Sequence, residues 1–385
     1  MTLEYVQTCF ENGSPLNWEI DSAGRVHLGL LYDRERGSPN RAAGHWHFQI
    51  HAPAGTELKL VLENFDNIWN GHPGSPISDR TNCYLSSDGT NWSAVPIRKT
   101  ADNKLEFSVH MEGPTLTLAR LEPYRLSDLD RLLAEIRPHP AVEIQPIGKT
   151  SEGRPLEIVR VGRPDAPFRV LLRARSHPWE PGGNWVVQGL IRCLLEDSQE
   201  NRDYLNRYCV YILPMADKDG VVQGRTRFNR HGMDLNRNWE QPADPVLAPE
   251  NAALEGWLES LIGRGMGPQL ALDLHNDNSG KLHVSRPGVS GSRHASRMWV
   301  LEDLLRRHTW FTEGSKIPAG DGPWTIGDGL LVRYGIDACI LELNADWIAG
   351  LGKPPFGADW EQFGQQLRAV FFEYFALLSA QGAHA

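Results

Sequence analysis

The chain has 385 residues, more than one compact core usually holds, so its length predicts two domains. A composition with 41% hydrophobic residues, 23% charged residues and 13 Trp excludes general disorder and is typical of a globular protein. The formal net charge of −9 excludes a broad basic surface, so we expect neither nucleic acid nor a membrane as a partner.

The first residues and the cysteines bear on the cellular compartment. The start, MTLEYVQTCFENGSPLNW, lacks the basic and apolar regions of a secretory signal, and no later stretch approaches the roughly 18 apolar residues of a membrane span. The five cysteines are odd in number, widely spaced and without a C-x-x-C pair, a pattern that favours reduced thiols over a thiolate metal site. We therefore expect a cytoplasmic protein.

Short runs of alternating hydrophobicity characterise residues 1–124. They occur at 45–52, 57–65 and 105–111 and are separated by clusters of Gly, Pro, Asn and Asp. This pattern predicts an all-β amino-terminal domain, an antiparallel β-sandwich. Tryptophans in such a sandwich either line a sugar site or form the core, and the core is the commoner place for them. The candidates are Trp46, Trp69 and Trp92.

The hydrophobic pattern of the sequence changes near Tyr124. Residues 127–136 have an N-cap Ser and helical apolar spacing, and two prolines follow them. Strand patterns then alternate with helical patterns, which predicts an α/β domain over residues 125–385. The expected strands are 169–174, 208–215, 269–275 and 338–344, and the expected helices are 183–197, 251–262, 296–308 and 359–379.

Candidate metal ligands stand where two of these strands end, which is where open α/β sheets usually place their sites. His177 and Glu180 follow the strand at 169–174 in SHPWEPGGNW, and His275 ends the strand at 269–275. A catalytic zinc needs about three imidazole or carboxylate ligands and one open position, so these three side chains form a candidate set. An H-x-x-E pair alone is a weak signal, and two solvated surface residues remain the alternative.

Residues 217–239 form a loop that is rich in Gly and Arg. Its four arginines, in an acidic protein, indicate a local anion site, because guanidinium groups match carboxylates in a bidentate fork. A solvated turn is the alternative interpretation. These arginines are Arg225, Arg227, Arg230 and Arg237.

Glu342 lies among apolar residues in the strand at 338–344. An unpaired buried carboxylate is costly, so such a glutamate usually faces a partner, a cavity or a reacting water. This position therefore favours a functional role.

Taken together, HPWE, the loop from DGV to DLNRNW, LDLH and ILEL resemble the zinc carboxypeptidase family in identity, order and spacing. The resemblance covers roughly residues 126–378. The preceding segments CFENG and HWHFQI are similar to the amino-terminal domain of the cytosolic carboxypeptidase branch. The family fold is a mixed eight-stranded sheet sandwiched by helices, so we expect a carboxypeptidase-like α/β fold preceded by an all-β sandwich.

The resemblance also implies a metal centre with one Zn²⁺ per chain. His177, Glu180 and His275 match the family's zinc ligands. Asp234 matches a residue that orients a ligand imidazole from outside the ligand set.

The remaining roles concern substrate and catalysis. Glu342 matches the family's catalytic glutamate, a general base, and Arg227 its oxyanion arginine. Asn236 and Arg237 match the pair that holds the substrate's terminal carboxylate.

One departure from the family concerns a mobile tyrosine that usually precedes the catalytic glutamate by about twenty residues. Residues 311–333 contain no tyrosine, and Trp324 is the nearest bulky residue. Tyr334 lies too close to Glu342 to be assigned that role. The Gly-rich loop from Pro318 to Gly329 is either a lid or a plain surface loop.

These inferences predict a zinc-dependent carboxypeptidase that acts on the C-terminus of peptides or proteins. The cytosolic branch suggests acidic chain ends, which Arg225 and Arg230 could receive. One alternative is an amidohydrolase of small N-acyl amino acids, since desuccinylases and aspartoacylases share H-x-x-E and a DLNR-like element. The other is an inactive binding protein, and the sequence leaves homo-oligomer formation open.

Overall fold

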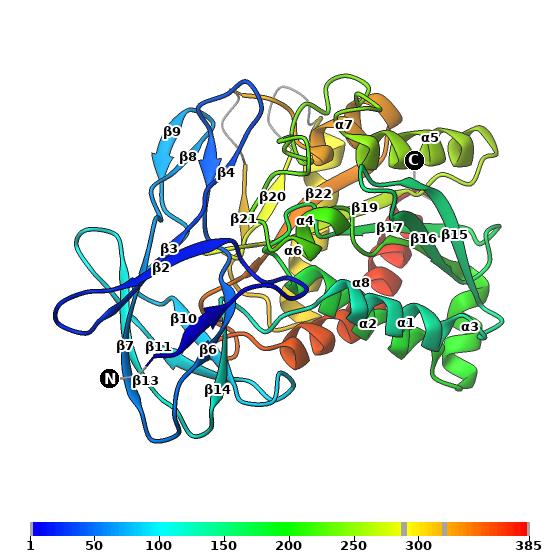
Figure 1. Cartoon of the computed structure of the whole chain (residues 1–385). Coiled ribbons are helices and arrows are strands. Elements are labelled where there is room, and N and C mark those ends of the chain that lie inside the picture. The colour runs from blue at the N-terminus through cyan, green and yellow to red at the C-terminus, as the bar shows by residue number, and fades with distance from the viewer. Residues whose placement is uncertain (1–2, 286–290, 318–321, 383–385) are drawn as a thin grey trace.

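The computed structural model describes residues 3–285, 291–317 and 322–382. Figure 1 shows a half built from β-strands beside a half in which helices flank a central sheet. The β half contains the strands up to residue 119, and the helical half begins at residue 126. The boundary near Tyr124 lies between these two points and stays our prediction.

Two five-stranded sheets form the β half, together with a smaller four-stranded sheet. The first sheet has the order β1 (Tyr5–Gln7), β6 (His47–His51), β14 (Thr115–Ala119), β10 (Asn82–Ser86), β11 (Ser93–Pro96). The second has the order β12 (Arg98–Lys99), β13 (Leu105–His110), β7 (Glu57–Glu63), β3 (Val26–Leu30), β2 (Leu16–Ile20). The third has the order β4 (Asp33–Arg34), β5 (Arg41–Ala42), β8 (Asn67–Trp69), β9 (His72–Gly74).

The two larger sheets share one apolar core, as in a sandwich. Alternate residues of β3 and β7 meet Phe48 and Ile50 of β6 in this core, where Trp46 is fully buried. One detail differs from the antiparallel pattern expected from sequence, because β3 and β7 pair in parallel. Alternating hydrophobicity reports which face of a strand is buried and not the direction of its neighbour.

A tight hairpin connects β8 and β9 in the small sheet. Its two loop residues, Asn70 and Gly71, both have positive φ, which a type I′ turn requires and which Asn-Gly tolerates best. The backbone N–H of Gly71 donates to Oδ1 of Asn40 at 2.8 Å. The hairpin is therefore anchored to the chain that precedes β5.

The helical half is organised around a mixed eight-stranded sheet, as the sequence predicted. Four central strands run parallel to one another, so their carboxyl ends lie at the same edge. The order is β15 (Val142–Lys149), β16 (Pro155–Val161), β18 (Tyr208–Leu213), β17 (Phe168–Ala174), β19 (Leu270–Asp277), β22 (Asp337–Asn344), β20 (Leu282–Val284), β21 (Ser315–Lys316).

Helices cover both faces of this sheet (Figure 1). One core lies between the sheet and α1 (Leu126–Ile136), α2 (Gly182–Leu195), α3 (Gln199–Arg207), α6 (Ser292–His308), α8 (Gly357–Gly382). A second core lies under α5 (Pro249–Gly263) and α7 (Ile326–Tyr334), and the short α4 (Lys218–Val222) follows β18. The central strands supply residues to both cores, which explains their continuous apolar runs.

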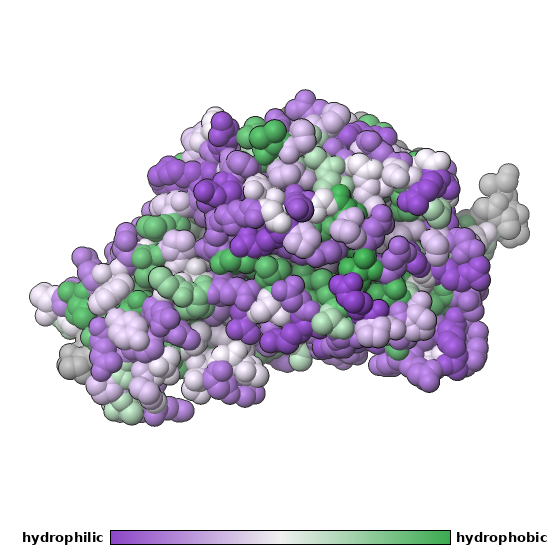
Figure 2. All heavy atoms as spheres, turned by 45° about the vertical axis from the view of Figure 1, so that its right-hand side comes forward, coloured by the Kyte–Doolittle hydropathy of each residue, from purple (hydrophilic) through white to green (hydrophobic). Residues whose placement is uncertain are grey.

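Figure 2 shows a face on which hydrophilic residues predominate, with hydrophobic residues gathered in a band across its middle. Within the described residues, no helix has both the length and the apolar character that a membrane crossing would need.

Candidate active site

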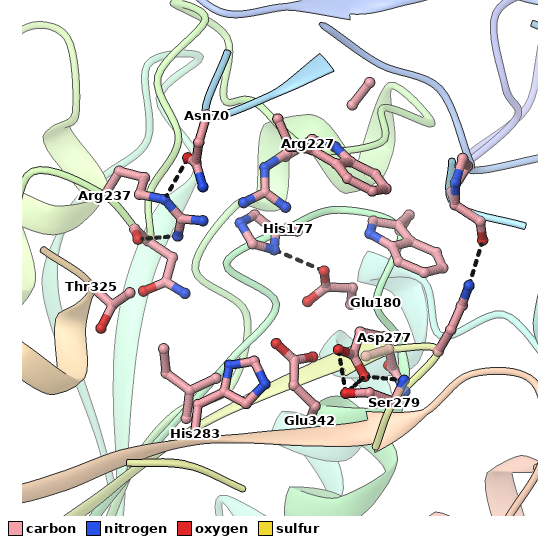
Figure 3. A pocket seen from close by; sticks show the side chains of 18 of the residues that line it. Asn70, His177, Glu180, Arg227, Arg237, Asp277, Ser279, His283, Thr325 and Glu342 are labelled. Carbon is pink, nitrogen blue, oxygen red and sulfur yellow. Dashed lines mark hydrogen bonds and ion pairs between the residues drawn. The ribbon is translucent and has the colours of Figure 1, made fainter. Parts of the chain in front are cut away.

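A cavity of about 660 Å³ opens at the carboxyl edge of the central sheet (Figure 3). His177 and Glu180 reach it from the loop after β17, and Glu342 from β22. Trp69 and Asn70 of the small sheet line the same cavity. The cavity therefore lies between the β half and the helical half.

Three donor side chains converge beside this cavity. Glu180 lies between the two imidazoles, with Oε1 2.8 Å from Nδ1 of His177 and Oε2 2.8 Å from Nδ1 of His275. The two Nδ1 atoms are 3.2 Å apart. All three side chains are at least 97% buried.

The loop that carries His177 and Glu180 begins with a strained residue. Arg175 has a φ of 62°, which is unusual for a long side chain and turns the chain sharply at the end of β17. Its buried guanidinium holds this turn, because Nε donates to the carbonyl of Pro178 at 2.7 Å and Nη1 donates to Oδ1 of Asn184 at 3.0 Å. The sharp turn and these bonds position the loop toward the cavity.

A carboxylate contacts the outward nitrogen of each imidazole. Oδ1 of Asp234 lies 3.1 Å from Nε2 of His177, and Oδ2 of Asp273 lies 2.6 Å from Nε2 of His275. Such carboxylates fix ring orientation and leave the other nitrogen free to bind a metal. Both Nδ1 atoms consequently face Glu180.

The electrostatics of the cluster follow from this crowding. Burial opposes ionisation of Glu180, but the two neighbouring imidazoles hold its pKa well below its usual value. Burial disfavours a charged His275, yet Asp273 and Glu180 together raise its pKa well above the usual value. Negative charge therefore surrounds the imidazoles, a field that favours a cation.

The donor set matches a catalytic zinc. Tetrahedral zinc with bonds near 2.0–2.2 Å requires ligand atoms roughly 3.3 Å apart, and here they are 2.8–3.2 Å apart. Two imidazoles and one carboxylate are a usual ligand set for such a site, and the open side of the cluster faces the cavity. His177, Glu180 and His275 could therefore hold a zinc ion.

Glu342 lies next to the cluster on the neighbouring parallel strand, where it pairs in register with His275. Its Oε2 is buried and has no hydrogen-bond partner among the described residues. Burial raises the pKa of Glu342 well above its usual value, and the Asp277 carboxylate adds to this rise. A raised pKa makes the ionised carboxylate a stronger proton acceptor.

Arg227 extends from the loop after α4 toward His177 (Figure 3). Its Nε and Nη2 lie 2.8 and 2.7 Å from Oδ2 of Asp234. Burial favours the neutral acid, but Arg227 and His177 hold the pKa of Asp234 well below its usual value. Asp234 thus connects the arginine to a candidate metal ligand.

Asn236 and Arg237 stand on the other side of the cavity. The Asn236 side chain accepts the backbone N–H of Ile326, which begins α7, at 3.1 Å. Arg237 donates from Nη1 to the Asn236 carbonyl at 2.8 Å and from Nε to Oδ1 of Asn70 at 3.4 Å. No carboxylate of the described residues forms an ion pair with Arg237, so its charge is directed to the cavity.

The other two loop arginines lie elsewhere. Arg225 donates to the Asn229 carbonyl and to Gln223, and Arg230 is exposed and pairs with Glu152. Neither lines the cavity.

Trp324, the bulky residue singled out in place of the tyrosine, packs against the core under α5 and α7. It does not line the cavity, and neither does Tyr334. Part of the expected lid, residues 318–321, lies outside the described residues. Of the tryptophans in the β half, only Trp69 lines the cavity, whereas Trp46 and Trp92 pack against apolar cores.

Several residues in or beside the cavity were not assigned a role from sequence. Asp273 belongs to the LDLH segment, where an acidic residue inside an apolar strand was the available signal. His283 is a histidine of β20, and burial lowers its pKa to about 4. No sequence pattern indicated a role for Asn70 or Lys316, because only the folded chain brings them to the cavity.

Comparison with known proteins agrees with this geometry. A profile described as zinc carboxypeptidase matches residues 130–256, and one described as the cytosolic carboxypeptidase N-terminal domain matches residues 6–121. The two matches follow each other along the chain, so this chain is similar to zinc carboxypeptidases that carry the cytosolic type of N-terminal domain. His275 and Glu342 lie beyond the residues that the two profiles match, so their place at the site comes from the structure.

Individual relatives show how far the similarity extends. Cytosolic carboxypeptidase 1 of Mus musculus is 34% identical over 121 residues, 31% of this chain and 10% of the mouse protein. The chain thus matches about a tenth of that relative's length. Two solved structures share the fold over nearly the whole chain.

The first is a metallo-carboxypeptidase from Burkholderia cenocepacia, with a TM-score of 0.85 and 19% identity over 97% of this chain and 99% of that one. The second is a metallo-carboxypeptidase from Pseudomonas aeruginosa in complex with (2-guanidinoethylmercapto)succinic acid. Its TM-score is 0.78, with 23% identity over 95% of this chain and 97% of that one.

Proposed function

We propose that this protein is a zinc-dependent carboxypeptidase that removes the C-terminal residue of peptides or proteins. The observation that carries the proposal is the content of one cavity: a three-donor cluster, the unpartnered carboxylate of Glu342 and the guanidinium groups of Arg227 and Arg237. These are the parts that metal-assisted hydrolysis of a chain end requires.

Arg237 and Asn236 would bind the terminal carboxylate of the substrate. No described carboxylate forms an ion pair with the positively charged Arg237, and Asn236 adds an amide beside it. A guanidinium can form two parallel hydrogen bonds to a carboxylate. This arrangement selects a free chain end over an internal peptide bond.

The chemistry is hydrolysis of the last peptide bond. Zinc held by His177, Glu180 and His275 would supply a Lewis acid at the scissile carbonyl. Glu342 takes a proton from the attacking water as its oxygen bonds to the carbonyl carbon, and returns a proton to the amine as the C–N bond breaks. Arg227 stabilises the negative charge that develops on the carbonyl oxygen.

The cavity also supports a preference for acidic C-terminal residues. Lys316 lines it and adds a positive charge, whereas His283 is neutral near pH 7 because burial lowers its pKa. Lys316, rather than Arg225 or Arg230, is therefore our candidate for contact with an acidic side chain. Exchange of Lys316 for Met should reduce kcat/KM for peptides ending in Glu about tenfold and leave peptides ending in Leu unchanged.

The similarity to cytosolic carboxypeptidases supports a cytoplasmic location. Peptide or protein C-termini would be the substrates there. Homo-oligomer formation stays an open prediction.

Mass spectrometry of a peptide set with free and amidated C-termini tests the function. We expect wild-type protein loaded with zinc to remove C-terminal residues from free ends only, and a chelator to stop the reaction. An active enzyme that leaves all peptides intact but hydrolyses N-acyl amino acids would instead identify the small-substrate amidohydrolase. Absence of both reactions would favour the binding protein.

A further inference from the structure

The β half holds the loop that carries Arg227 at several points. The backbone N–H of Asn12 donates to the Val222 carbonyl at 3.1 Å, and that of Arg36 donates to the Gly232 carbonyl at 2.8 Å. Between these points, Oγ1 of Thr226 accepts the backbone N–H of Gly44 at 3.1 Å. Residues 222–232 therefore take their path from contacts with the other half of the protein.

Asp33 of β4 makes the contact nearest to the arginine. Its Oδ2 accepts the backbone N–H groups of both Thr226 and Arg227, each at 2.7 Å. Hydrogen bonds to a carboxylate are shorter and stronger than those between neutral groups. One oxygen atom thus fixes two successive peptide units at the base of the Arg227 side chain.

Asp33 is itself firmly held. β4 pairs with β5 through Asp33 and Ala42, and Ala42 lines the cavity. Burial raises the pKa of Asp33 to about 6, although the backbone N–H of Arg227 and the charge of Arg225 act in the opposite direction. Burying this carboxylate is therefore costly, and its bonds to the loop offset part of that cost.

Thr226 also connects this contact to the candidate metal centre. Its carbonyl accepts the backbone N–H of Trp179, in the loop that carries His177 and Glu180, at 3.3 Å. Displacement of Thr226 would therefore change the distance between Arg227 and the ligand loop.

We infer that Asp33 is a positioning residue, which places the Arg227 guanidinium for stabilisation of the reacting carbonyl oxygen. The catalytic consequence rests on the proposed carboxypeptidase function, whereas the placement of the loop does not. The β half thereby completes the active site with a residue that does not itself touch the substrate.

The test compares Asp33→Ala with Asp33→Asn, whose amide oxygen can still accept both N–H groups. Glu11→Ala is the matched control, because the Glu11 carboxylate also accepts a backbone N–H of the helical half, that of Ser127 at 2.9 Å, away from the arginine loop. Hydrogen exchange of peptides covering residues 222–233 reports on the loop with or without activity. Kinetics with a free-ended peptide and a cycle with Arg227→Ala report on catalysis.

We expect faster exchange of the loop in Asp33→Ala, but not in Asp33→Asn or Glu11→Ala. We expect kcat of Asp33→Ala to fall about tenfold or more with KM within about threefold, and Asp33→Asn to recover most of the loss. With Arg227→Ala already present, Asp33→Ala should cost less than about threefold. Should Asp33→Ala not fold, Asp33→Glu, which displaces the carboxylate by one methylene group, takes its place.

Unchanged exchange in Asp33→Ala would overturn the inference, and so would a kcat loss that persists in the Arg227→Ala background. If the wild type is inactive on every peptide, the proposed function fails while the exchange measurement still decides the placement of the loop.

Discussion

The two sides of the cavity are built in different ways. The candidate ligands His177, Glu180 and His275 come from one sheet edge, and the carboxylates that orient them also belong to the helical half. The arginine side depends on the β half, since Asp33 holds the backbone at Arg227 and Asn70 contacts Arg237. The ligand side is therefore built from the helical half, whereas the arginine side is built from both halves.

This difference indicates which half of the protein determines metal affinity and which determines substrate orientation. Metal affinity should depend mainly on the helical half, because the described hydrogen bonds of the three candidate ligand side chains all lie within it. Substrate orientation should depend on the docking of both halves. Variants in the β half should therefore change catalysis more than metal binding.

The largest effect is expected at Glu342, which faces both regions. Glu342→Gln removes the proposed general base, so activity should fall about 10²- to 10⁴-fold while the expected zinc content of one ion per chain is kept. Steady-state kinetics and metal analysis by mass spectrometry check this, with the exposed Asp303→Asn of α6 as a control. Loss of zinc in Glu342→Gln would mean that the glutamate belongs to the ligand set.

Arg227→Ala tests the arginine side of the cavity, which both halves build. We expect kcat to fall about 10²- to 10³-fold, because a preorganised donor to the carbonyl oxygen is lost. Zinc affinity should change far less, since Asp234 keeps its contact with His177. Arg230→Ala is the control from the same loop, and an equal loss of activity in both variants would contradict a specific role for Arg227.

Asp273→Asn tests the ligand side of the cavity, which the helical half builds. The amide no longer holds the outward nitrogen of His275 with a negative charge, so zinc affinity should fall about 10- to 100-fold. Competition with a chromogenic chelator measures this change. Asp33→Asn, in the β half, should leave zinc affinity unchanged. An equal decrease of zinc affinity in Asp33→Asn would contradict the difference between the two sides of the cavity.

A further prediction concerns the pH dependence of stability. The pKa of Asp33 rises from 3.8 to about 6 on folding, so the folded state binds the proton more tightly. This contribution to stability is full below about pH 3.8 and is lost as the pH rises through about 6, with a size of about 3 kcal/mol.

Because Asp33→Asn cannot titrate, its stability relative to wild type should increase between pH 4 and pH 7. Urea unfolding at several pH values measures the difference. A difference that stays constant would show that Asp33 keeps an ordinary pKa.

Much of the fold could be predicted because its signals are local. The strands β18, β19 and β22 are continuous apolar runs, and α8 shows helical spacing over most of its length. The parallel pairing of β3 with β7 could not be predicted, since it depends on how distant strands meet.

The site was predictable where chemistry and motif coincide. His177, Glu180, His275 and Glu342 were chosen from sequence, and the structure brings them to one cavity edge. Asp33 lies 194 positions from Arg227, and nothing local distinguishes it from other turn or strand aspartates. Arg225 and Arg230 are predicted from charge alone, and the sequence does not reveal that neither of them lines the cavity.

The pairing register of β19 and β22 fixes one distance at the site. His275 and Glu342 stand opposite each other on hydrogen-bonded neighbouring strands, so their backbone positions are one strand spacing apart, about 4.8 Å. Loops around the cavity can change in length and chemistry without disturbing that interval. A change in those loops could therefore alter which substrates fit, while the backbone spacing between Glu342 and His275 stays that of the sheet.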